Sequence, residues 1–167
     1  MISVSQLIWN SLTGQAIVPQ LLIWTLEGQR YALPLAAVER VVRAVAVTPF
    51  PAAPGAVCGI VNVQGQVVAV IDLRRRLQLP ARAIALSDQM VLASTARRRL
   101  ALIADAVNGV AECADEAVVA AGPILSGAGY MSGVVQLDDG MILIHDLDRF
   151  LSLDEELALE KALSDAE

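Results

Sequence analysis

The sequence predicts a mainly β fold, built as a barrel or a sandwich. About ten short apolar runs are separated by turn residues, a spacing typical of antiparallel β architectures. Of the 167 residues, 56% are hydrophobic and only 4% aromatic, so we expect a core of small and branched aliphatic side chains. The stretch 48–55 contains three prolines. It is predicted as a rigid connector, because proline lacks the N–H donor that a helix interior or a central strand requires.

Each strand is predicted from an apolar or alternating run bounded by turn residues. The predicted strands cover residues 21–26, 30–35, 40–47, 57–63, 67–71, 89–94, 100–106, 107–112, 130–137 and 141–145. Hairpin turns are expected at Gly28, Gly65 and Gly140, because glycine supplies the positive φ that a tight turn needs. The stretches 80–88 and 114–129 are predicted as irregular loops.

The two ends of the chain differ from its centre. Ser152 and Glu155 fit the capping box of a helix start. The following leucines, at positions 153, 157, 159 and 163, fall within about 160° of arc, which predicts an amphipathic helix that docks one face. Residues 1–18 are consistent with either a short helix or a frayed arm. We therefore divide the chain into an N-terminal arm (1–18), a β domain (19–152) and a C-terminal helix (153–167).

An internal similarity refines this picture. Residues 65–77 resemble residues 140–151, with Asp, Leu, Arg and Leu recurring at an offset of 74. Each copy is interpreted as a turn, an apolar strand and a short helix, with Asp72 or Asp146 as the cap. Two such units indicate two sub-barrels in one chain. Chance similarity in a chain rich in leucine and valine is the alternative.

Composition and charge exclude several classes of function. The net charge is −6 and the pI is near 4.7, which opposes attraction to a phosphate backbone, so nucleic acid is not expected as a partner. The arginine triplets 74–76 and 97–99 are interpreted as solvated faces or turn residues. No run reaches the ~18 apolar residues of a membrane span, so no direct membrane insertion is expected. The first basic residue is Arg30, so no secretory signal is expected and a cytoplasmic location is favoured.

The chain also lacks a convincing reactive centre. With one histidine and two isolated cysteines, Cys58 and Cys113, no metal site is expected, and no phosphate-binding loop or other cofactor motif occurs. Cys58 with His145 is the available thiol–imidazole pair for a hydrolase. Cys58 is interpreted instead as a small buried hydrophobe in an apolar strand, and His145 as a partly buried structural residue. No catalytic residue is therefore predicted, and a binding module is favoured over an enzyme.

Several motifs follow one another in a recognisable order. They are Tyr31-Ala32-Leu33-Pro34-Leu35, then Val38 with Val41-Val42, then the proline-rich stretch 49–54, then 59–73 with its Gly59, Asn62, Gly65 and Asp72-Leu73, and finally 104–110. In this order they resemble the CheW-like domain family over roughly residues 20–152. The resemblance implies two five-stranded SH3-like barrels packed around a shared hydrophobic interface, with short helices.

The same resemblance implies a function and partners. Members of the family are non-enzymatic adaptors that join the cytoplasmic signalling tip of chemoreceptors to the regulatory domain of the histidine kinase CheA. Receptor and kinase contacts are expected at barrel edges and in the groove between the barrels. A CheW-like scaffold of a sibling pathway, serving surface motility or second-messenger control through a different receptor, is the alternative.

The resemblance also suggests site residues. The expected receptor-binding residues are Val38, Arg40, Gln64 and Gly65, and the expected structural turn and cap residues are Gly59, Asn62, Asp72 and Asp146. Gln64 stands where the family usually has an arginine, and Arg40 where it usually has a glutamate, with Glu39 adjacent. Exchange of charge at an interface alters which partner is tolerated more readily than it alters the fold.

Overall fold

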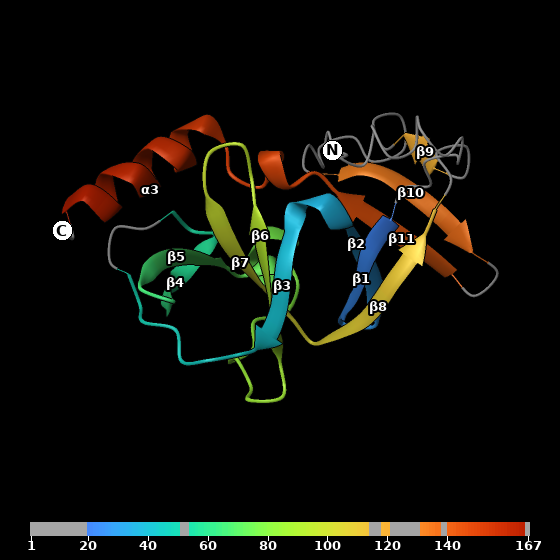
Figure 1. Cartoon of the computed structure of the whole chain (residues 1–167), viewed down its shortest axis with the longest axis horizontal. Helices are drawn as coiled ribbons and strands as arrows, with labels where there is room; N and C mark the ends of the chain where they lie inside the picture. The colour runs from blue at the N-terminus through green and yellow to red at the C-terminus, as the bar shows by residue number, and fades with distance from the viewer. Residues whose placement is uncertain (1–19, 51–53, 114–117, 121–130, 138–139, 166–167) are drawn as a thin grey trace, which may run out of the picture.

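Two β-sheets lie side by side, and a C-terminal helix lies beside one of them (Figure 1). The structure is a computed structural model that describes residues 20–50, 54–113, 118–120, 131–137 and 140–165. The predicted arm at 1–18 and the turn residues Asp138 and Asp139 lie outside these residues. The predicted mainly β fold is confirmed.

The strand order is defined for both sheets. The first sheet has the order β8 (Ala106–Glu112), β1 (Gln20–Leu26), β2 (Gln29–Pro34), β11 (Gly140–His145), β10 (Met131–Leu137) and β9 (Val118–Ala120). The second sheet has the order β3 (Val38–Arg43), β6 (Gln89–Ser94), β7 (Arg99–Ala104), β5 (Gln66–Ile71) and β4 (Val57–Val63). The helical segments are η1 (Leu35–Ala37), α2 (Leu73–Arg76), η3 (Leu147–Arg149) and α3 (Leu153–Asp165).

The two sheets repeat one plan. In the second sheet β4 pairs with β5 antiparallel, β5 with β7 in parallel, β7 with β6 antiparallel and β6 with β3 antiparallel. In the first sheet β10, β11, β2, β1 and β8 follow the same sequence of pairings. The first sheet thus contains an equivalent five-stranded unit, to which the short β9 adds a sixth strand on β10. Each unit also contributes a strand to the other, because β3 follows β2 and β8 follows β7 in the chain but both join the opposite sheet.

The predicted caps confirm the repeat at the level of single residues. Asp72 follows β5 and accepts a hydrogen bond from the Arg74 N–H at 3.0 Å, which starts α2. Asp146 follows β11 and accepts one from the Asp148 N–H at 3.1 Å, which starts η3. Both carboxylates satisfy a backbone donor that the helical turn leaves open.

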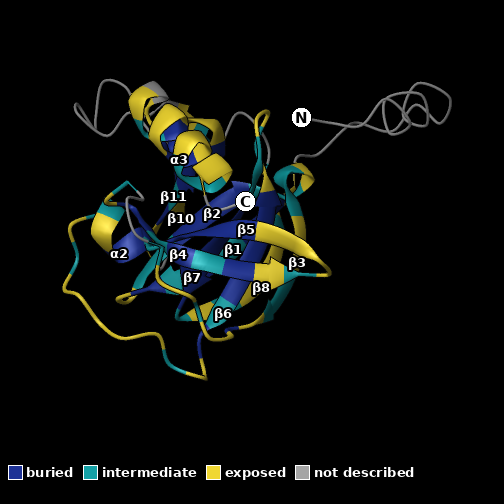
Figure 2. Ribbon diagram, turned by 90° about the vertical axis from the view of Figure 1, so that its left-hand side faces the viewer, coloured by how far each residue is buried: buried dark blue, intermediate teal, exposed yellow. Residues whose placement is uncertain are grey.

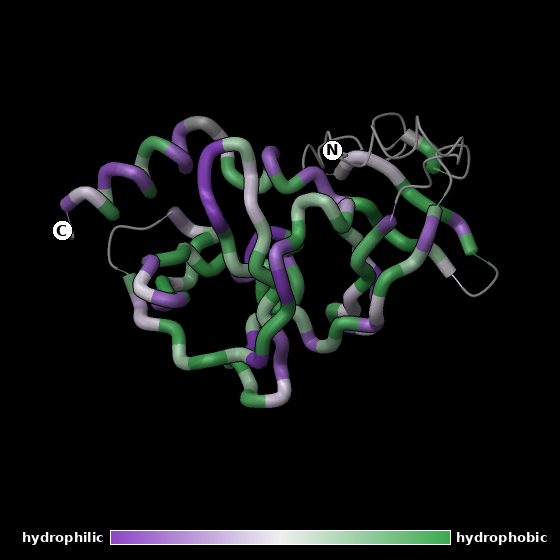
Figure 3. The backbone as a smooth tube through the Cα atoms, viewed as in Figure 1, coloured by the Kyte–Doolittle hydropathy of each residue, from purple (hydrophilic) through white to green (hydrophobic). Residues whose placement is uncertain are grey.

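One hydrophobic core lies between the two sheets. Its buried side chains come from β1 and β2 of the first sheet and from β5, β6 and β7 of the second, and they are joined by Leu147, Phe150 and Leu159. A smaller core lies on the other side of each sheet. Buried residues run along the strand centres, whereas hydrophilic stretches occur on β3, on the β6–β7 turn and along α3 (Figures 2 and 3). Because the sheets share their main core, they form one packed body.

Several predicted boundaries are wrong. The strand expected at 100–106 ends as β7 at Ala104, and Ala106 already belongs to β8. The strand expected at 40–47 is β3, which begins at Val38 and ends at Arg43. Beyond Arg43 the chain leaves β6, where the Ala44 N–H donates to Asp88 O at 3.0 Å, and crosses to β4, where Thr48 and Ile60 form an isolated bridge. The stretch 114–129, expected to be irregular, contains β9. Pairing with β10 makes these three residues a strand, although their run is too short to predict one.

Helix α3 begins with the predicted capping box, because the Glu155 N–H donates to Ser152 Oγ and the Ser152 N–H to Glu155 Oε2. The predicted docking face is wrong for Leu157, which is 55% exposed, whereas Leu159 is fully buried. Ion pairs complete the docking. Glu155 pairs with Arg76 at 2.8 Å, and Glu156 pairs with Arg98 at 2.7 Å. The outer face of α3 stays exposed (Figure 2).

Candidate partner-binding site

The residues expected to bind a receptor gather at one end of the second sheet. Val38 and Arg40 lie at the start of the edge strand β3, opposite the end of β6. Gln64 and Gly65 form the β4–β5 turn. Because β5 and β7 are parallel neighbours, both start at this end of the sheet, and β7 in turn adjoins β6. The structure therefore places all four predicted residues at the same end of one sheet.

A row of polar side chains crosses this end of the sheet. Arg99 of β7 holds Glu39 of β3 through two nitrogens, Nε at 2.9 Å and Nη2 at 2.6 Å, and its Nη1 donates to Gln66 Oε1 of β5. Ser94 Oγ donates to Glu39 Oε1 at 2.7 Å. The hydrogen bond from Arg99 lowers the pKa of Glu39 below its ordinary value, and the bond from Ser94 adds to the effect. We call Glu39, Arg99 and Gln66 the polar row.

The β4–β5 turn is held rigidly. Gln64 and Gly65 both have positive φ, 51° and 83°, as a two-residue turn that matches the strand twist requires. Asn62, near the end of β4, accepts a hydrogen bond through Oδ1 from the Gly65 N–H at 2.8 Å and so closes the turn. Both Gln64 and Gly65 are exposed. The turn therefore presents the Gln64 side chain to solvent in a defined position.

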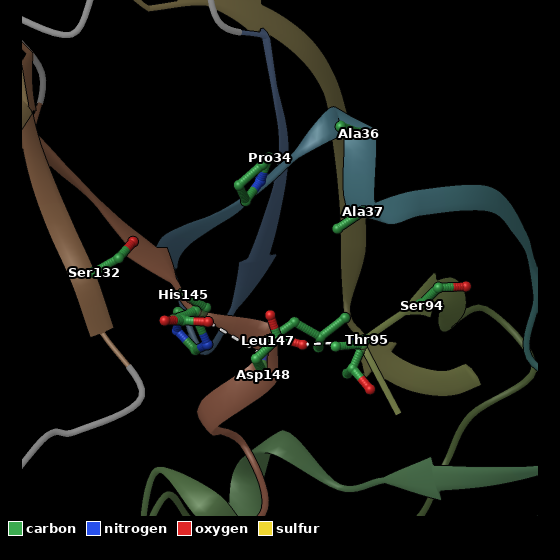
Figure 4. A pocket seen from close by; sticks show the side chains of 11 residues that line it. Pro34, Ala36, Ala37, Ser94, Thr95, Ser132, His145, Leu147 and Asp148 are labelled. Carbon is green, nitrogen blue, oxygen red and sulfur yellow. Dashed lines mark hydrogen bonds between the residues drawn. The ribbon is translucent and has the colours of Figure 1, made fainter. Parts of the chain in front are cut away.

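An open groove lies beside the polar row, between the two sheets (Figure 4). Its volume is about 480 Å³. Small side chains line most of it, and they come from the end of β2 with η1, from the β6–β7 turn, from β10 and from the start of η3. The lining residues are Pro34, Ala36, Ala37, Ser94, Thr95, Ala96, Ser132, His145, Asp146, Leu147 and Asp148. Ser94 belongs to the groove and also contacts Glu39, so the groove and the polar row form one continuous candidate site.

His145 lies at the base of this groove within a cluster of rings. It is fully buried rather than partly buried as predicted, with Trp24, Tyr31 and Phe150 at centroid distances of 5.7, 5.0 and 4.9 Å. Burial among these rings lowers the pKa of His145 to about 3. The imidazole is therefore neutral at neutral pH and serves as part of the core.

This burial predicts a pH-dependent stability. In the unfolded chain the histidine pKa is about 6.5, so below pH 6.5 the imidazole of the unfolded state binds a proton. In the native state His145 stays unprotonated down to about pH 3. The free energy of unfolding is expected to decrease by up to about 1.4 kcal/mol per pH unit as the pH falls below 6.5. Since this is the chain's one histidine, His145→Phe should flatten urea-unfolding stability between pH 5 and 6.5. An unchanged slope in the variant would contradict the assignment.

The arginine triplets match their predicted role in part, because Arg75 and Arg97 are exposed, whereas Arg74 is buried. Arg74 is 5% exposed and reaches two carboxylates, donating through Nη2 to Asp105 Oδ1 at 2.7 Å and through Nη1 to Glu27. Arg82 joins the cluster by pairing with Asp105 at 2.6 Å and with Asp88 at 2.9 Å. Partial burial opposes ionisation of Asp105, but hydrogen bonds from Arg74, the Glu27 amide and Arg82 prevail and lower its pKa. Arg74 and Arg82 therefore hold the packed structure together, and Arg74 is not part of a solvated face.

The structure does not bring the candidate catalytic pair together. Cys58 is half-buried on β4 of the second sheet, where its Sγ donates to Val70 O and burial raises the pKa of its thiol. His145 is in the ring cluster on β11 of the first sheet. Within the described part of the chain, no group of three or more His, Cys, Asp or Glu side chains is arranged to hold a metal ion. No helix among the described residues is long and apolar enough to cross a membrane.

A second exposed surface lies at the opposite end of the second sheet. The loop before β6 is closed by Arg82, which binds both oxygens of Asp88 at 2.9 and 3.1 Å, and by the Ala85 N–H, which donates to Asp88 at 2.8 Å. The closed loop presents Leu86, which is 88% exposed, together with the exposed Ile84. Val45 is also exposed, next to Ala44, which bonds to Asp88. We call Val45, Ile84 and Leu86 the apolar patch.

Comparison with known proteins identifies the fold and the family. A sequence model of the CheW-like domain matches residues 20–155, most of the chain. The chain belongs to the CheW-like domain family. The resemblance found in its motifs is thus confirmed, and with it the assignment to an adaptor family rather than an enzyme family.

Relatives and solved structures agree with this membership. The CheW-like chain is 25% identical over 142 residues to the chemotaxis protein CheW of Treponema pallidum, covering 81% of this chain and 84% of that one. It is 24% identical over 152 residues to the chemotaxis protein CheW of Klebsiella aerogenes, covering 90% and 91%. The scaffolding protein TtCheW of Thermoanaerobacter tengcongensis has the same fold, with a TM-score of 0.76, 24% identity and coverage of 83% and 96%.

Sequence reasoning missed several residues of the site in this CheW-like chain. It placed Arg40 at the expected acidic position, whereas Glu39 is the residue that forms the ion pair, with Arg99 as its partner. A register shift between Val38 and Arg40 sets Glu39 apart from the regular β3–β6 pairing. The groove residues Thr95 and Asp148 carried no local signal. Only the packing of the β6–β7 turn against η3 brings them together, and there the Ala96 N–H donates to Asp148 Oδ1 at 2.8 Å.

Proposed function

We propose that this chain is a non-enzymatic adaptor of a bacterial chemosensory system, which couples the cytoplasmic signalling tip of a chemoreceptor to the regulatory domain of the histidine kinase CheA. The supporting observation is the presence of two exposed surfaces at opposite ends of the second sheet. One end carries the open groove, the polar row and the Gln64 turn, and the other carries the apolar patch. Relatives named as chemotaxis proteins and a structural neighbour named as a scaffolding protein support the same function.

The two surfaces differ in character, which suits two different partners. We assign the groove end to the receptor, because its residues include Val38, Arg40, Gln64 and Gly65. We assign the apolar patch to the kinase regulatory domain, because a rigid loop with an exposed leucine has the features of an interface anchor. A rigid sheet between them would hold both partners at a fixed separation. The direct test is a pull-down with a purified receptor tip and with the kinase regulatory domain, and binding of neither would refute the proposal.

A sibling pathway with a different receptor is the second candidate. It is favoured by one observation, the neutral Gln64 at the tip of the β4–β5 turn, with Glu39 paired to Arg99 of β7 instead. A receptor whose surface is complementary to an arginine at this turn would contact a neutral side chain in this protein. Comparison of binding to receptor tips from a chemotaxis array and from a motility or second-messenger pathway separates the two candidates.

Removal of the Gln64 side chain should weaken receptor binding without loss of stability. Gln64→Gly deletes an exposed side chain and suits the positive φ of 51°, so unfolding should not become easier. Binding to the receptor tip, measured by calorimetry, should weaken by about tenfold. Gln78→Gly is the matched control, since Gln78 is also exposed and has a φ of 56°. Equal receptor affinity in both variants would contradict the placement of the receptor at this turn.

A charged residue introduced into the apolar patch should weaken binding of the kinase regulatory domain but not binding of the receptor tip. Leu86 is 88% exposed, so Leu86→Glu should change the free energy of unfolding by no more than about 0.5 kcal/mol. It should weaken binding to the kinase regulatory domain by about tenfold or more, and it should leave receptor-tip binding intact. Leu157→Glu, on the exposed face of α3, is the control. A loss of receptor binding in Leu86→Glu would show that the two surfaces are assigned incorrectly.

A further inference from the structure

The repeated plan of the two units means that the groove has an equivalent on the other side of the molecule. The groove is bounded by the β2–β3 link with η1, by the β6–β7 turn and by the helical turn that Asp146 caps. The equivalent elements, in the same pairing order, are the β7–β8 link at Asp105, the β1–β2 turn at Glu27 and the helical turn that Asp72 caps. The same arrangement of a strand link, a hairpin turn and a capped helical turn therefore occurs twice in the molecule.

The second occurrence is filled from within the chain. Arg74, two residues after the capping Asp72, extends across it and donates to Glu27 on the β1–β2 turn and to Asp105 on the β7–β8 link. The guanidinium also donates to Pro80 O at 3.5 Å, and the side chain is 6% exposed. A buried arginine with carboxylates on two of the three bounding elements thus closes this copy of the site.

The open groove carries the opposite arrangement. Asp148, two residues after the capping Asp146, occupies the position equivalent to Arg74. The facing link and turn provide Ala36, Ala37, Thr95 and Ala96, whose small side chains leave the volume of about 480 Å³ empty (Figure 4). Among the described residues Asp148 forms no ion pair, and its carboxylate accepts one hydrogen bond, from Ala96 N–H. The position that supplies a cation in one copy supplies an unpaired anion in the other.

We propose that the open groove receives an arginine side chain from the receptor tip, with its guanidinium against Asp148, in the space that corresponds to the one the Arg74 guanidinium fills in the other copy. This inference rests on the proposed function, because it names the chemistry by which the receptor is recognised. Charge complementarity supports it, since Asp148 lines the groove without an ion pair among the described residues, whereas Asp146 pairs with Arg149 and Glu39 pairs with Arg99. A volume of this size falls within the range of small-ligand sites, and small walls allow a planar guanidinium to approach closely.

The first test measures receptor binding. Asp148→Asn removes the charge but keeps an oxygen that accepts from the Ala96 N–H, so the groove should keep its shape. Affinity for a purified receptor tip is expected to fall at least fivefold. Replacement of one exposed arginine of the tip by glutamine should cause the same loss with the wild-type chain and no further loss with Asp148→Asn. Asp154→Asn, an exposed carboxylate at the start of α3, is the matched control. If the tip binds the wild type and Asp148→Asn equally, the inference is wrong while the proposed function stands.

The second test needs no receptor. N-acetyl-arginine amide, titrated into the isotope-labelled full chain, should cause saturable NMR shifts of the amides of Ala36, Ala37, Thr95 and Ala96, with a Kd on the order of 10 mM. The neutral isostere N-acetyl-citrulline amide should cause none, and Asp148→Asn should abolish the response. Equal shifts with citrulline, or shifts scattered over the surface, would overturn the inference. If the tip does not bind the wild type at all, the proposed function fails, and this titration still decides whether the groove recognises a guanidinium.

Discussion

Replacement of Arg74 by methionine is expected to destabilise the fold by about 3 kcal/mol, the lower end of the cost of breaking a buried ion pair. Arg74 is 5% exposed, and its removal leaves the Glu27 and Asp105 carboxylates without their shared cation. These carboxylates keep some solvent contact, with 42% and 30% of their side chains exposed, which limits the loss. Thermal unfolding should show a Tm lowered by roughly 10 °C.

Arg75 provides a matched control for this prediction. It is the next residue of α2, and its side chain is 54% exposed. It forms an ion pair with Asp72 at 3.4 Å and donates a hydrogen bond to Gly55 O at 3.3 Å. Arg75→Met should change stability by no more than about 0.5 kcal/mol. If the two variants unfold alike, the Arg74 cluster does not stabilise the packing of the two sheets.

The same cluster predicts a response to acid. The pKa of Asp105 is lowered in the folded protein, so its contribution is complete above the ordinary carboxyl pKa and is lost as the pH falls through the lower, folded value. In Arg74→Met the carboxylate loses its main stabilising donor, and its pKa should rise. NMR titration of Asp105 in both proteins measures that rise directly.

The features predictable from sequence were those with local signals. Asp72, Asp146 and Ser152 each cap a helical turn within three residues, and the glycine turns are set by neighbouring residues. Arg74 was mispredicted because its partners Glu27 and Asp105 lie 47 and 31 residues away. No periodicity indicates such a contact.

The candidate site was predictable in part for the same reason. The family motifs placed Gln64 and Gly65 on an exposed turn, and that turn can be recognised from a few residues. The groove is assembled from five segments that adjoin only after β3 and β8 have joined opposite sheets. Alternation within a strand shows which side chains share a face, but it does not show which sheet the strand joins. The groove therefore required the structure.

Gly59→Ala should be nearly as damaging as the loss of Arg74, although it adds a single methyl group. Gly59 was expected at a turn, but it lies within β4, where a Cβ atom would overlap the carbonyl oxygen of Thr48 and lie 2.5 Å from Val47 Cγ1. The connector here is held by two hydrogen bonds of 2.9 Å between Thr48 and Ile60. Overpacking against backbone, with loss of this bridge, should cost about 2–4 kcal/mol.

Gly55→Ala is the control for that substitution, because a Cβ at Gly55 meets no atom within 4 Å, and it should be neutral or slightly stabilising. The two variants also differ in their expected effect on association. Thr48 covers part of β4, the edge strand of the second sheet, and an uncovered edge can pair with another chain. Gly59→Ala should therefore form soluble oligomers on warming, as measured by light scattering. If it stays monomeric and as stable as Gly55→Ala, the close approach of the connector to β4 does not constrain position 59.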